Sequence, residues 1–184
     1  HLISTLPLPR LAGMAQGVPA PLRRLGGRLK HVNVLNFNLG LRGARRCESH
    51  WVYFPEKEFV FYRVGFPTNF APALAPKGCS AAYVEISYRP GARLDVEALY
   101  RRVVEGLKRW GVISKESDII QTDAQRIEPA YVIFDRARAE AVKKLRAFFA
   151  SRGVLSVGRY GQWDYLSMED SLNIGRRLAA ELAS

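Results

Sequence analysis

The clearest pattern along the chain is the alternation of apolar and polar residues in two segments. Within His31–Leu41, every second position from Leu35 to Leu41 is apolar, and Asn36 and Asn38 lie between them. Ala81–Tyr88 alternates in the same way. A period of two is typical of a strand with one buried face. Both segments are therefore predicted strands.

Shorter apolar segments predict further strands. Trp51–Phe54 and Phe59–Val64 flank the polar residues 55–58, and this spacing predicts a hairpin. Single strands are predicted at Leu2–Leu6, which Pro7 and Pro9 would end, at Ile119–Ile127 and at Val154–Val157. Residues 10–29 and 66–77 are rich in glycine or proline and read as loops, the first with room for one short helix.

Three helices are predicted from caps and from apolar residues three or four apart. Asp95 caps a helix that Gly111 ends, and Asp135 caps a second that Gly153 closes. A third begins at Ser167. The order of elements predicts an α+β chain with a largely antiparallel sheet and flanking helices.

Composition limits the class of protein. The 184 residues include 28 Lys or Arg and 17 Asp or Glu, a net charge of +11, and 48% are hydrophobic. Such a chain can bury a core, and it is neither a disordered acidic tail nor a disulfide-stapled miniprotein. Nor does it contain an apolar run long enough to span a membrane.

The basic charge is concentrated near the start of the chain. Residues 1–47 contain eight basic residues and no acidic one. Nucleic acid, a solvated face or an acidic partner would each explain this. No helix-turn-helix, zinc-finger or RNA-recognition signature accompanies the charge, so the sequence does not favour nucleic acid.

Cysteine and histidine point to no metal site and no hydrolytic triad. Cys47 and Cys79 lie 32 residues apart, and no histidine stands at ligand spacing. Two reduced thiols would suit a cytoplasmic protein, although a disulfide stays open. His31 and His50 have no visible nucleophile beside them, and the sequence identifies no catalytic residue.

The last 30 residues offer a physical basis for anion binding. The predicted strand at Val154–Val157 runs into Gly158 and Arg159, and a helix follows. Glycine permits close approach to the backbone, arginine supplies several donors, and a helix N-terminus exposes N–H groups. Ser167 with Asp170 also fits a capping box, a purely structural alternative.

These residues resemble a known motif. Gly158–Glu169 is similar to the C-terminal flavin-contact motif of UDP-galactopyranose mutases and of protoporphyrinogen-oxidase-like and amine-oxidase-like FAD proteins. Gly158, Arg159, Tyr165, Met168 and Glu169 match it, whereas Ser167 stands where the mutases have an acid. The segments at 2–9, 50–55, 61–64 and 129–132 also resemble this family, so the similarity covers nearly the whole chain.

The resemblance implies roles for seven residues. Gly158, Arg159, Met168 and Glu169 would lie beside FAD, where a helix N-terminus favours negative charge on the reduced ring. Tyr131, Tyr165 and Arg63 would contact a small-molecule substrate. One alternative is that this substrate carries an anionic group. Arg63 lies in an apolar segment and needs either an acidic partner or a substrate anion, and both readings stay open.

The resemblance also implies that a domain is missing. The family binds FAD through an N-terminal Rossmann unit with a G-x-G-x-x-G turn, and that spacing does not occur here. With no initiator Met either, we expect the chain to start partway into a longer protein. Residues 1–29 would leave the FAD-binding domain, 30–152 form the substrate-binding domain and 153–184 return to the FAD-binding domain.

The functional expectation is a fragment of an FAD-dependent oxidoreductase or mutase. Alone, the fragment should be inactive and bind FAD weakly or not at all. The apolar ends at Leu2–Leu6 and Val154–Leu182 would pack on the missing domain or pair between two copies in a homodimer. The alternative function is a non-catalytic basic module that binds nucleic acid or an anionic sugar.

Overall fold

The chain folds into two compact units. A computed structural model describes residues 1–43 and 47–183. Unit 1 comprises residues 1–31 and 131–184, and unit 2 comprises residues 32–130. The domain boundaries that the sequence analysis expected at residues 30 and 153 are those of the longer protein that the resemblance implies. Within this chain, the segment from 131 to 152 groups with the two terminal segments.

Unit 2 is built on a five-stranded sheet with the order β3-β4-β5-β2-β6. The strands are β2 (His31–Arg42), β3 (Trp51–Tyr53), β4 (Arg63–Gly65), β5 (Cys79–Tyr88) and β6 (Ile119–Val132). The pairs β3–β4, β4–β5 and β5–β2 are antiparallel. The predicted α+β class with a largely antiparallel sheet is thus confirmed, including the hairpin between β3 and β4.

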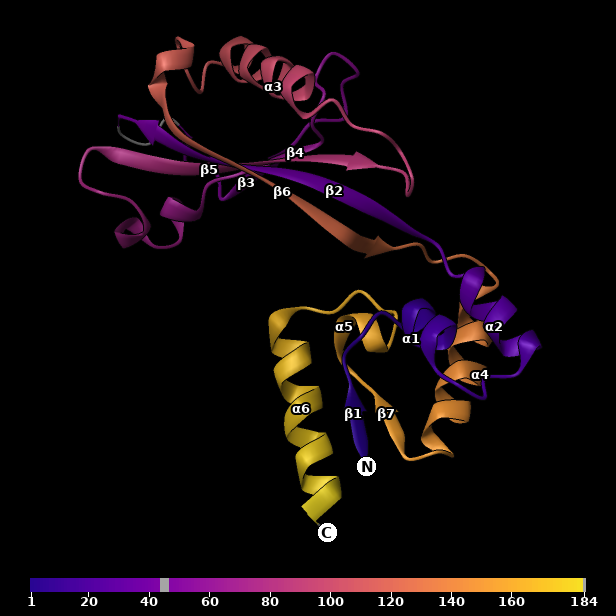
Figure 1. Ribbon diagram of the computed structural model, residues 1–184. Helices are drawn as coiled ribbons and strands as arrows, with labels where there is room; N and C mark the ends of the chain where they lie inside the picture. Colours follow the sequence, from indigo (N-terminus) through magenta and orange to yellow (C-terminus); the bar gives the residue numbers. More distant parts are fainter. Residues whose placement is uncertain (44–46, 184) are drawn as a thin grey trace. The chain divides into compact units, whose positions relative to one another are not determined.

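One face of this sheet is buried as the alternation predicted. Leu35, Phe37 and Leu39 are buried, and helix α3 (Val96–Trp110) lies over that face (Figure 1). Its N-cap is Asp95, whose carboxylate accepts from the Ala98 amide at 2.9 Å, and Gly111 ends it in a left-handed conformation. Both predicted ends of this helix are confirmed.

The predicted strand at Phe59–Val64 is wrong in its first half. Only Arg63–Gly65 forms β4, while Phe61 leaves the sheet and packs against α3. A Cβ on Gly106 would lie 2.6 Å from the Phe61 ring, so this glycine makes room for the aromatic ring. Apolar packing against the helix therefore outweighs strand pairing at Phe59–Phe61.

Between the strands, the described residues of unit 2 form three short 3-10 helices. These are η1 (Pro67–Asn69), η2 (Pro72–Leu74) and η3 (Glu116–Asp118). The first two fall in the loop that was predicted at residues 66–77.

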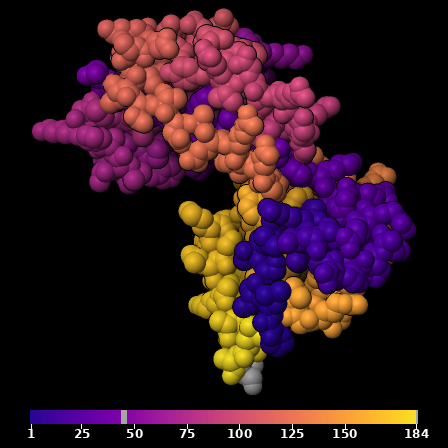
Figure 2. Space-filling view, in the orientation of Figure 1, coloured from indigo at the N-terminus to yellow at the C-terminus, as the bar shows by residue number. Residues whose placement is uncertain are grey.

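Unit 1 is mainly helical around a second core. Its elements are β1 (Leu2–Ser4), α1 (Leu8–Met14), α2 (Ala20–Gly27), α4 (Arg138–Ala150), β7 (Val154–Ser156), α5 (Gly158–Gly161) and α6 (Met168–Ala183). Leu8, Leu11, Leu145, Phe149 and Trp163 form most of the core. Figure 2 shows the two ends of the chain, indigo and yellow, side by side in this unit.

The prediction of a loop with room for one short helix at residues 10–29 is wrong in extent, because two helices cover most of this segment. Pro9 and Pro21 occupy the first turns of α1 and α2. A proline is tolerated there because first-turn N–H groups need no intrahelical acceptor. The sequence pattern instead predicts Pro9 at the end of a strand and Pro21 in a loop.

Two further helix boundaries differ from the predictions. Helix α4 begins at Arg138, and Asp135 caps the turn before it by accepting from the Arg138 amide at 3.0 Å. Residues Gly158–Gly161, predicted to lead into a turn, form the helical turn α5.

Strands β1 and β7 form a two-stranded parallel sheet. Leu2 pairs with Val154, Ile3 with Leu155 and Ser4 with Ser156. No residue described in α6 is buried. No helix in the described part of the chain is sufficiently long and apolar to cross a membrane.

Candidate functional site

The end of β7 positions the first candidate residues. The Val157 amide donates to the Ser4 carbonyl at 2.9 Å, so the exit of β7 is fixed against β1. Gly158 follows with φ +75°, a conformation that favours glycine, and a Cβ there would meet no atom within 4 Å. The backbone at Gly158 is therefore both specialised and open to close approach.

Gly161 closes the short helix α5 against the strand pair. A Cβ at this position would lie 3.0 Å from the Ser4 carbonyl oxygen. The Ser156 hydroxyl donates to the Gly161 carbonyl at 2.8 Å. Together these contacts hold α5, and with it Arg159, directly after β7.

Arg159 lies beside two aromatic rings. Its guanidinium carbon is 5.2 Å from the centre of the Tyr131 ring and 4.7 Å from that of the Tyr165 ring. The two rings are 5.8 Å apart and tilted by 31°. Nη1 of Arg159 also donates to the Leu166 carbonyl at 3.0 Å. Three residues that the resemblance singled out thus come together, and each contact of this kind is worth about 0.5–2 kcal/mol.

The start of α6 holds the remaining candidates of unit 1. The Ser167 amide donates to the Asp170 carboxylate at 2.8 Å, and the Asp170 amide donates to the Ser167 hydroxyl at 3.0 Å. The predicted capping box is therefore present. These bonds to Ser167 lower the pKa of Asp170 below its ordinary value.

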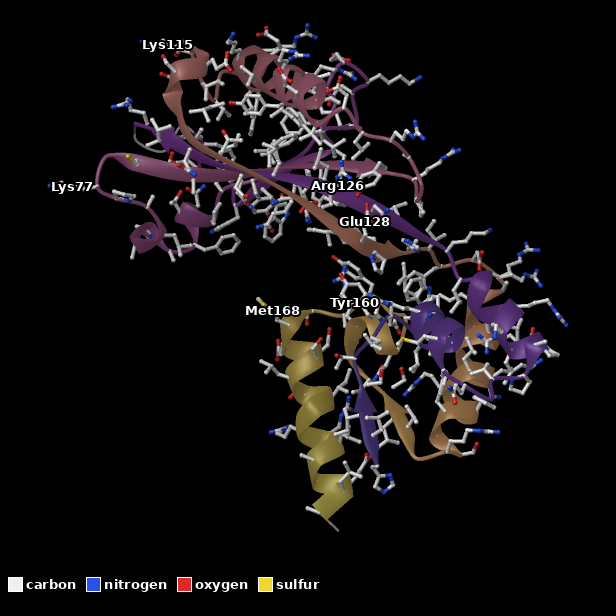
Figure 3. The ribbon with its side chains drawn as sticks, viewed as in Figure 1. Lys77, Lys115, Arg126, Glu128, Tyr160 and Met168 are labelled. Carbon is white, nitrogen blue, oxygen red and sulfur yellow. The ribbon has the colours of Figure 1, made fainter. Side chains whose placement is uncertain are left out.

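Met168 and Glu169 occupy the first turn of α6, where backbone N–H groups have no intrahelical acceptor. The Met168 side chain is 87% exposed and projects away from the helix (Figure 3). An anion or an electron-rich ring would be attracted to this helix end.

Arg63 lies in unit 2 and has an acidic partner. Its Nη2 is 2.6 Å and its Nε 3.1 Å from the two Glu85 carboxylate oxygens, a forked pair with both side chains mostly buried. The Tyr62 hydroxyl donates to the same carboxylate. Of the two readings left open, the salt bridge is present, and a role in binding substrate stays a prediction.

The surroundings of Arg63 are aromatic. The rings of Tyr53, Tyr62 and Tyr83 lie 5.8–5.9 Å from its guanidinium carbon. Tyr83 can lie flat against β4 because a Cβ on Gly65 would sit 2.0 Å from its ring. The sheet face opposite α3 therefore presents one arginine among three tyrosines.

The sheet face around Arg63 continues as polar residues on the next strands. The register places Asn36 beside Glu85 and Asn38 beside Tyr83. The side-chain amide of Asn36 donates to the side-chain oxygen of Asn38 at 2.8 Å. The side-chain amide of Asn38 donates to the Asp123 carboxylate at 3.3 Å. One face of the sheet is apolar core, and the other offers hydrogen-bonding groups.

The structure therefore groups six of the seven predicted site residues in unit 1 and places Arg63 in unit 2. Glu85, Tyr53 and Tyr83 were not singled out as site residues. The sequence did contain a signal for Glu85. It is an acid within an alternating apolar segment, and a buried acid needs a basic partner such as Arg63.

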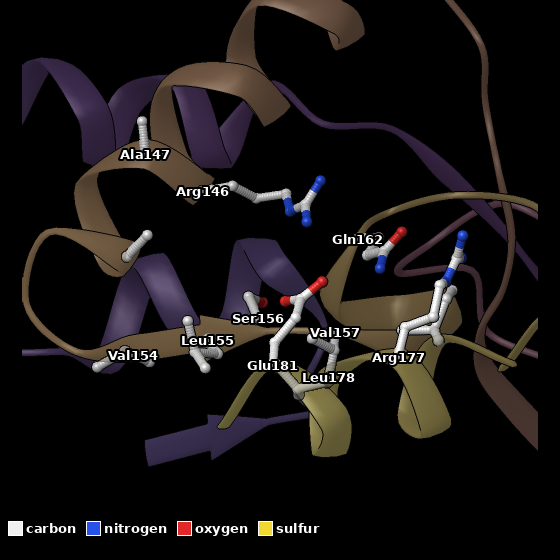
Figure 4. A pocket seen from close by; sticks show the side chains of 12 residues that line it. Arg146, Ala147, Val154, Leu155, Ser156, Val157, Gln162, Arg177, Leu178 and Glu181 are labelled. Atoms are coloured by element: carbon white, nitrogen blue, oxygen red, sulfur yellow. The ribbon is translucent and has the colours of Figure 1, made fainter. Parts of the chain in front are cut away.

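Two cavities adjoin the β1–β7 pair. One, of about 500 Å³, is lined by residues of α4, β7 and α6, with Arg146, Gln162, Arg177 and Glu181 around it (Figure 4). The other, of about 310 Å³, is lined mainly by apolar residues of β1 and α6. Among residues 1–43 and 47–183, no group of three or more His, Cys, Asp or Glu could hold a metal ion.

Comparison with known proteins identifies the fold. No family model matches the chain. Reduced UDP-galactopyranose mutase matches 90% of it at 23% identity and a TM-score of 0.81. A protein from Exiguobacterium sp. 255-15, provisionally assigned as a protoporphyrinogen oxidase, matches 100% at 13% identity and a TM-score of 0.75. An oxidoreductase from Methanosarcina mazei matches 69% at 16% identity and a TM-score of 0.51.

The matches cover only part of those proteins. The chain spans 36%, 41% and 31% of their respective lengths. The resemblance expected from the sequence is confirmed at the level of the fold: this chain has the fold of the corresponding parts of UDP-galactopyranose mutase and of the Exiguobacterium protein.

Proposed function

We propose that the chain is part of an FAD-dependent oxidoreductase, in which unit 2 binds substrate and unit 1 contacts the flavin. The observation that carries this proposal is the cluster of Arg159, Tyr131 and Tyr165 beside the N-terminus of α6. A cation, two aromatic rings and free helix amides suit a flat, electron-rich group with anionic parts. The shared fold supports the same reading.

The residues present fit FAD in chemical kind. Gly158 leaves room for a group against the backbone, and Met168 and Glu169 offer amides at the positive end of α6. Arg159 would hold an anionic oxygen beside the tyrosines. When bound, FAD supplies hydride and electron transfer, for which these residues provide binding and electrostatics.

The proposal requires a further FAD-binding region that covers unit 1. Parallel sheets are normally buried on both faces, and two strands alone are marginally stable. Here Leu2 and Ile3 are 60% and 52% exposed, two cavities flank the strand pair, and α6 has no buried residue. A dinucleotide-binding region that adds strands beside β7 would cover these surfaces.

In unit 2, the proposed substrate surface is the sheet face around Arg63. Glu85 neutralises the Arg63 charge and holds the guanidinium in place. The N–H donors of Arg63 are therefore oriented, and no unpaired charge is buried. The tyrosines Tyr53 and Tyr83 would contact the body of a small-molecule substrate. A substrate anion would add to the arginine's contacts rather than replace Glu85.

The test measures flavin on purified protein. We expect the 184-residue chain to carry little or no FAD and a polypeptide that adds the FAD-binding region to carry one FAD per chain, measured by flavin absorbance. Arg159→Met should weaken FAD binding in the longer protein by about tenfold, because a charged hydrogen bond contributes about 1.5–3 kcal/mol. Arg136→Met, an exposed arginine ahead of α4, is the matched control.

Two outcomes would contradict the proposal. One is stoichiometric FAD on the 184-residue chain alone. The other is a longer polypeptide that binds FAD equally well with and without Arg159. If instead two copies of the chain cover each other's exposed ends, sedimentation will give a dimer whose interface includes β1 and α6, as the sequence left open.

We place the intact protein in the cytoplasm, a reducing compartment in which cysteines such as Cys47 and Cys79 stay reduced. Labelling with a thiol reagent in unreduced cell extract tests this: both cysteines should react once the protein is unfolded. A disulfide in that extract would contradict a reducing compartment.

A second candidate function, a basic binding module, is favoured by one observation. Unit 1 contains 14 basic and six acidic residues, so it carries +8 of the net charge of +11. If this charge binds nucleic acid, retention on DNA will fall steeply with salt concentration. Weak retention without a steep salt dependence would rule out the nucleic-acid-binding function, and the oxidoreductase proposal would then stand as the single candidate.

A further inference from the structure

A single arginine outside the predicted site holds the segment that presents Arg159 and Tyr165. Arg138 is the first residue of α4, and its side chain is only 13% exposed. Its Nε donates to the Trp163 carbonyl at 2.8 Å, and its Nη2 donates to the same oxygen. Nη2 also lies 3.2 Å from the Asp164 carboxylate. One guanidinium thus binds two consecutive residues of the segment.

The contacts of Arg138 lead directly to the candidate site. The Asp164 carboxylate that it binds accepts from the Tyr165 amide at 2.8 Å. The Asp164 amide donates to the Arg159 carbonyl at 2.9 Å. Asp164 therefore connects Arg138 to both residues that form the cation–aromatic cluster with Tyr131.

The held segment needs such support, because its backbone is strained. Trp163 has φ +51°, which a large non-glycine residue rarely adopts, and it is 1% exposed. A conformation of this kind persists only where surrounding contacts enforce it. Hydrogen bonds from a charged donor to the Trp163 carbonyl supply such contacts.

Arg138 is itself rigidly placed. Its guanidinium lies 4.1 Å above the Phe134 ring, and its amide donates to Asp135, which in turn pairs with Lys30 at 3.1 Å. A lysine would keep the charge near Asp164 but could not present two donors to one carbonyl in a fixed plane.

The geometry points to Arg138 as the positioning residue of the flavin-contact segment: it fixes the Trp163 turn so that Arg159 and Tyr165 face an anionic ligand together. This inference rests on the proposed function. Arg138 would act through Trp163 and Asp164, without itself touching ligand.

The experiment uses the 184-residue chain, with inorganic pyrophosphate as the anionic probe and amide hydrogen exchange as an independent readout. In Arg138→Met, exchange at Asp164 and Tyr165 should accelerate about tenfold, and pyrophosphate binding should weaken about tenfold, as expected for loss of a charged hydrogen bond. Arg138→Lys should recover part of both effects. Arg136→Met, which removes a nearby exposed arginine, should change neither.

The outcomes separate this inference from the proposed function. If Arg138→Met exchanges like Arg136→Met, or if exchange accelerates equally throughout α4 and β7, Arg138 is not a positioning residue. If the unmodified chain does not bind pyrophosphate, the proposed anion contact at Arg159 fails, and the exchange data still decide the role of Arg138. Pyrophosphate binding that is unchanged in Arg138→Met, despite faster local exchange, also overturns the inference.

Discussion

The two units differ in how completely they bury their own apolar surface. Unit 2 has a five-stranded sheet with one face closed by α3, which buries Val103, Val104 and Leu107. Unit 1 also has a core, yet its strand pair is only two strands wide and no described residue of α6 is fully buried. The 99 residues of unit 2 thus bury one face of its sheet without help from other segments, whereas the elements at the two chain ends are incompletely packed.

The largest expected contrast comes from truncating one apolar side chain in each unit. Phe61→Ala should destabilise unit 2 by about 3–5 kcal/mol, because Phe61 is buried against α3. Leu172→Ala in α6 should change stability by less than about 0.5 kcal/mol, because Leu172 is 75% exposed. Denaturant unfolding measures both. A comparable cost at Leu172 would mean that α6 is packed after all.

A second contrast uses one glycine from each unit. Gly65→Ala should cost about 1–3 kcal/mol, since the new Cβ would displace the Tyr83 ring. Gly175→Ala in α6 meets no atom within 4 Å and should stabilise that helix by about 0.5–1 kcal/mol. Thermal unfolding compares the two variants. Equal effects would show that Tyr83 does not lie against Gly65.

The capping box of α6 offers a smaller and more local effect. Ser167→Ala removes the acceptor for the Asp170 amide and should weaken α6 by about 1 kcal/mol. Amide hydrogen exchange should accelerate in α6 while β2 and β5 stay unchanged. Ser171→Ala, which removes a hydroxyl that bonds back to the Ser167 carbonyl, is the control and should have a smaller effect.

The smallest expected effects come from changes in pH. Low pH should affect unit 1, and high pH should affect unit 2. In unit 1, bonds to Lys30 and to Ser167 lower the pKa values of Asp135 and Asp170, respectively. Their stabilisation is therefore complete above the ordinary carboxyl pKa and is lost as the pH falls through the lowered values. Asp170 is exposed and Asp135 is only partly buried, so the loss should be slight and visible mainly as faster exchange near α4 and α6.

In unit 2, burial and the hydrogen bond to Glu128 raise the pKa of Tyr88 to about 12, and Arg126 opposes the shift (Figure 3 labels Glu128 and Arg126 on β6). A raised pKa stabilises the fold below the ordinary tyrosine value, and that stabilisation is lost as the pH rises toward 12. Phenolate absorbance should contain a component, from Tyr88, that titrates at a pH of about 12. Tyr88→Phe should remove that component, and a titration curve unchanged by this substitution would refute the assignment.

Most of unit 2 could be predicted from local sequence pattern. The alternation at Leu35, Phe37 and Leu39, and the Asp95 and Gly111 caps of α3, depend on nearest neighbours along the chain. The failure at Phe61 had a tertiary cause, because the ring packs where Gly106 leaves space, and no pattern within 59–64 records a glycine in a distant helix.

In unit 1, the motif was easier to predict than its surroundings. The resemblance singled out Tyr131, Arg159 and Tyr165, which lie together, although local pattern alone had not distinguished a cap from an anion site. The two proline-led helices were missed because the same prolines can end or begin a helix. Arg138 carried no local signal, since its partners Trp163 and Asp164 lie some 25 residues away.

The most direct test of the account is the FAD content of a polypeptide that joins this chain to its proposed FAD-binding region, compared with the same protein carrying Arg159→Met. The account predicts one bound FAD per chain, weakened about tenfold by the substitution. A protein that folds, exposes neither β1 nor α6 to exchange, and still holds no FAD would contradict it.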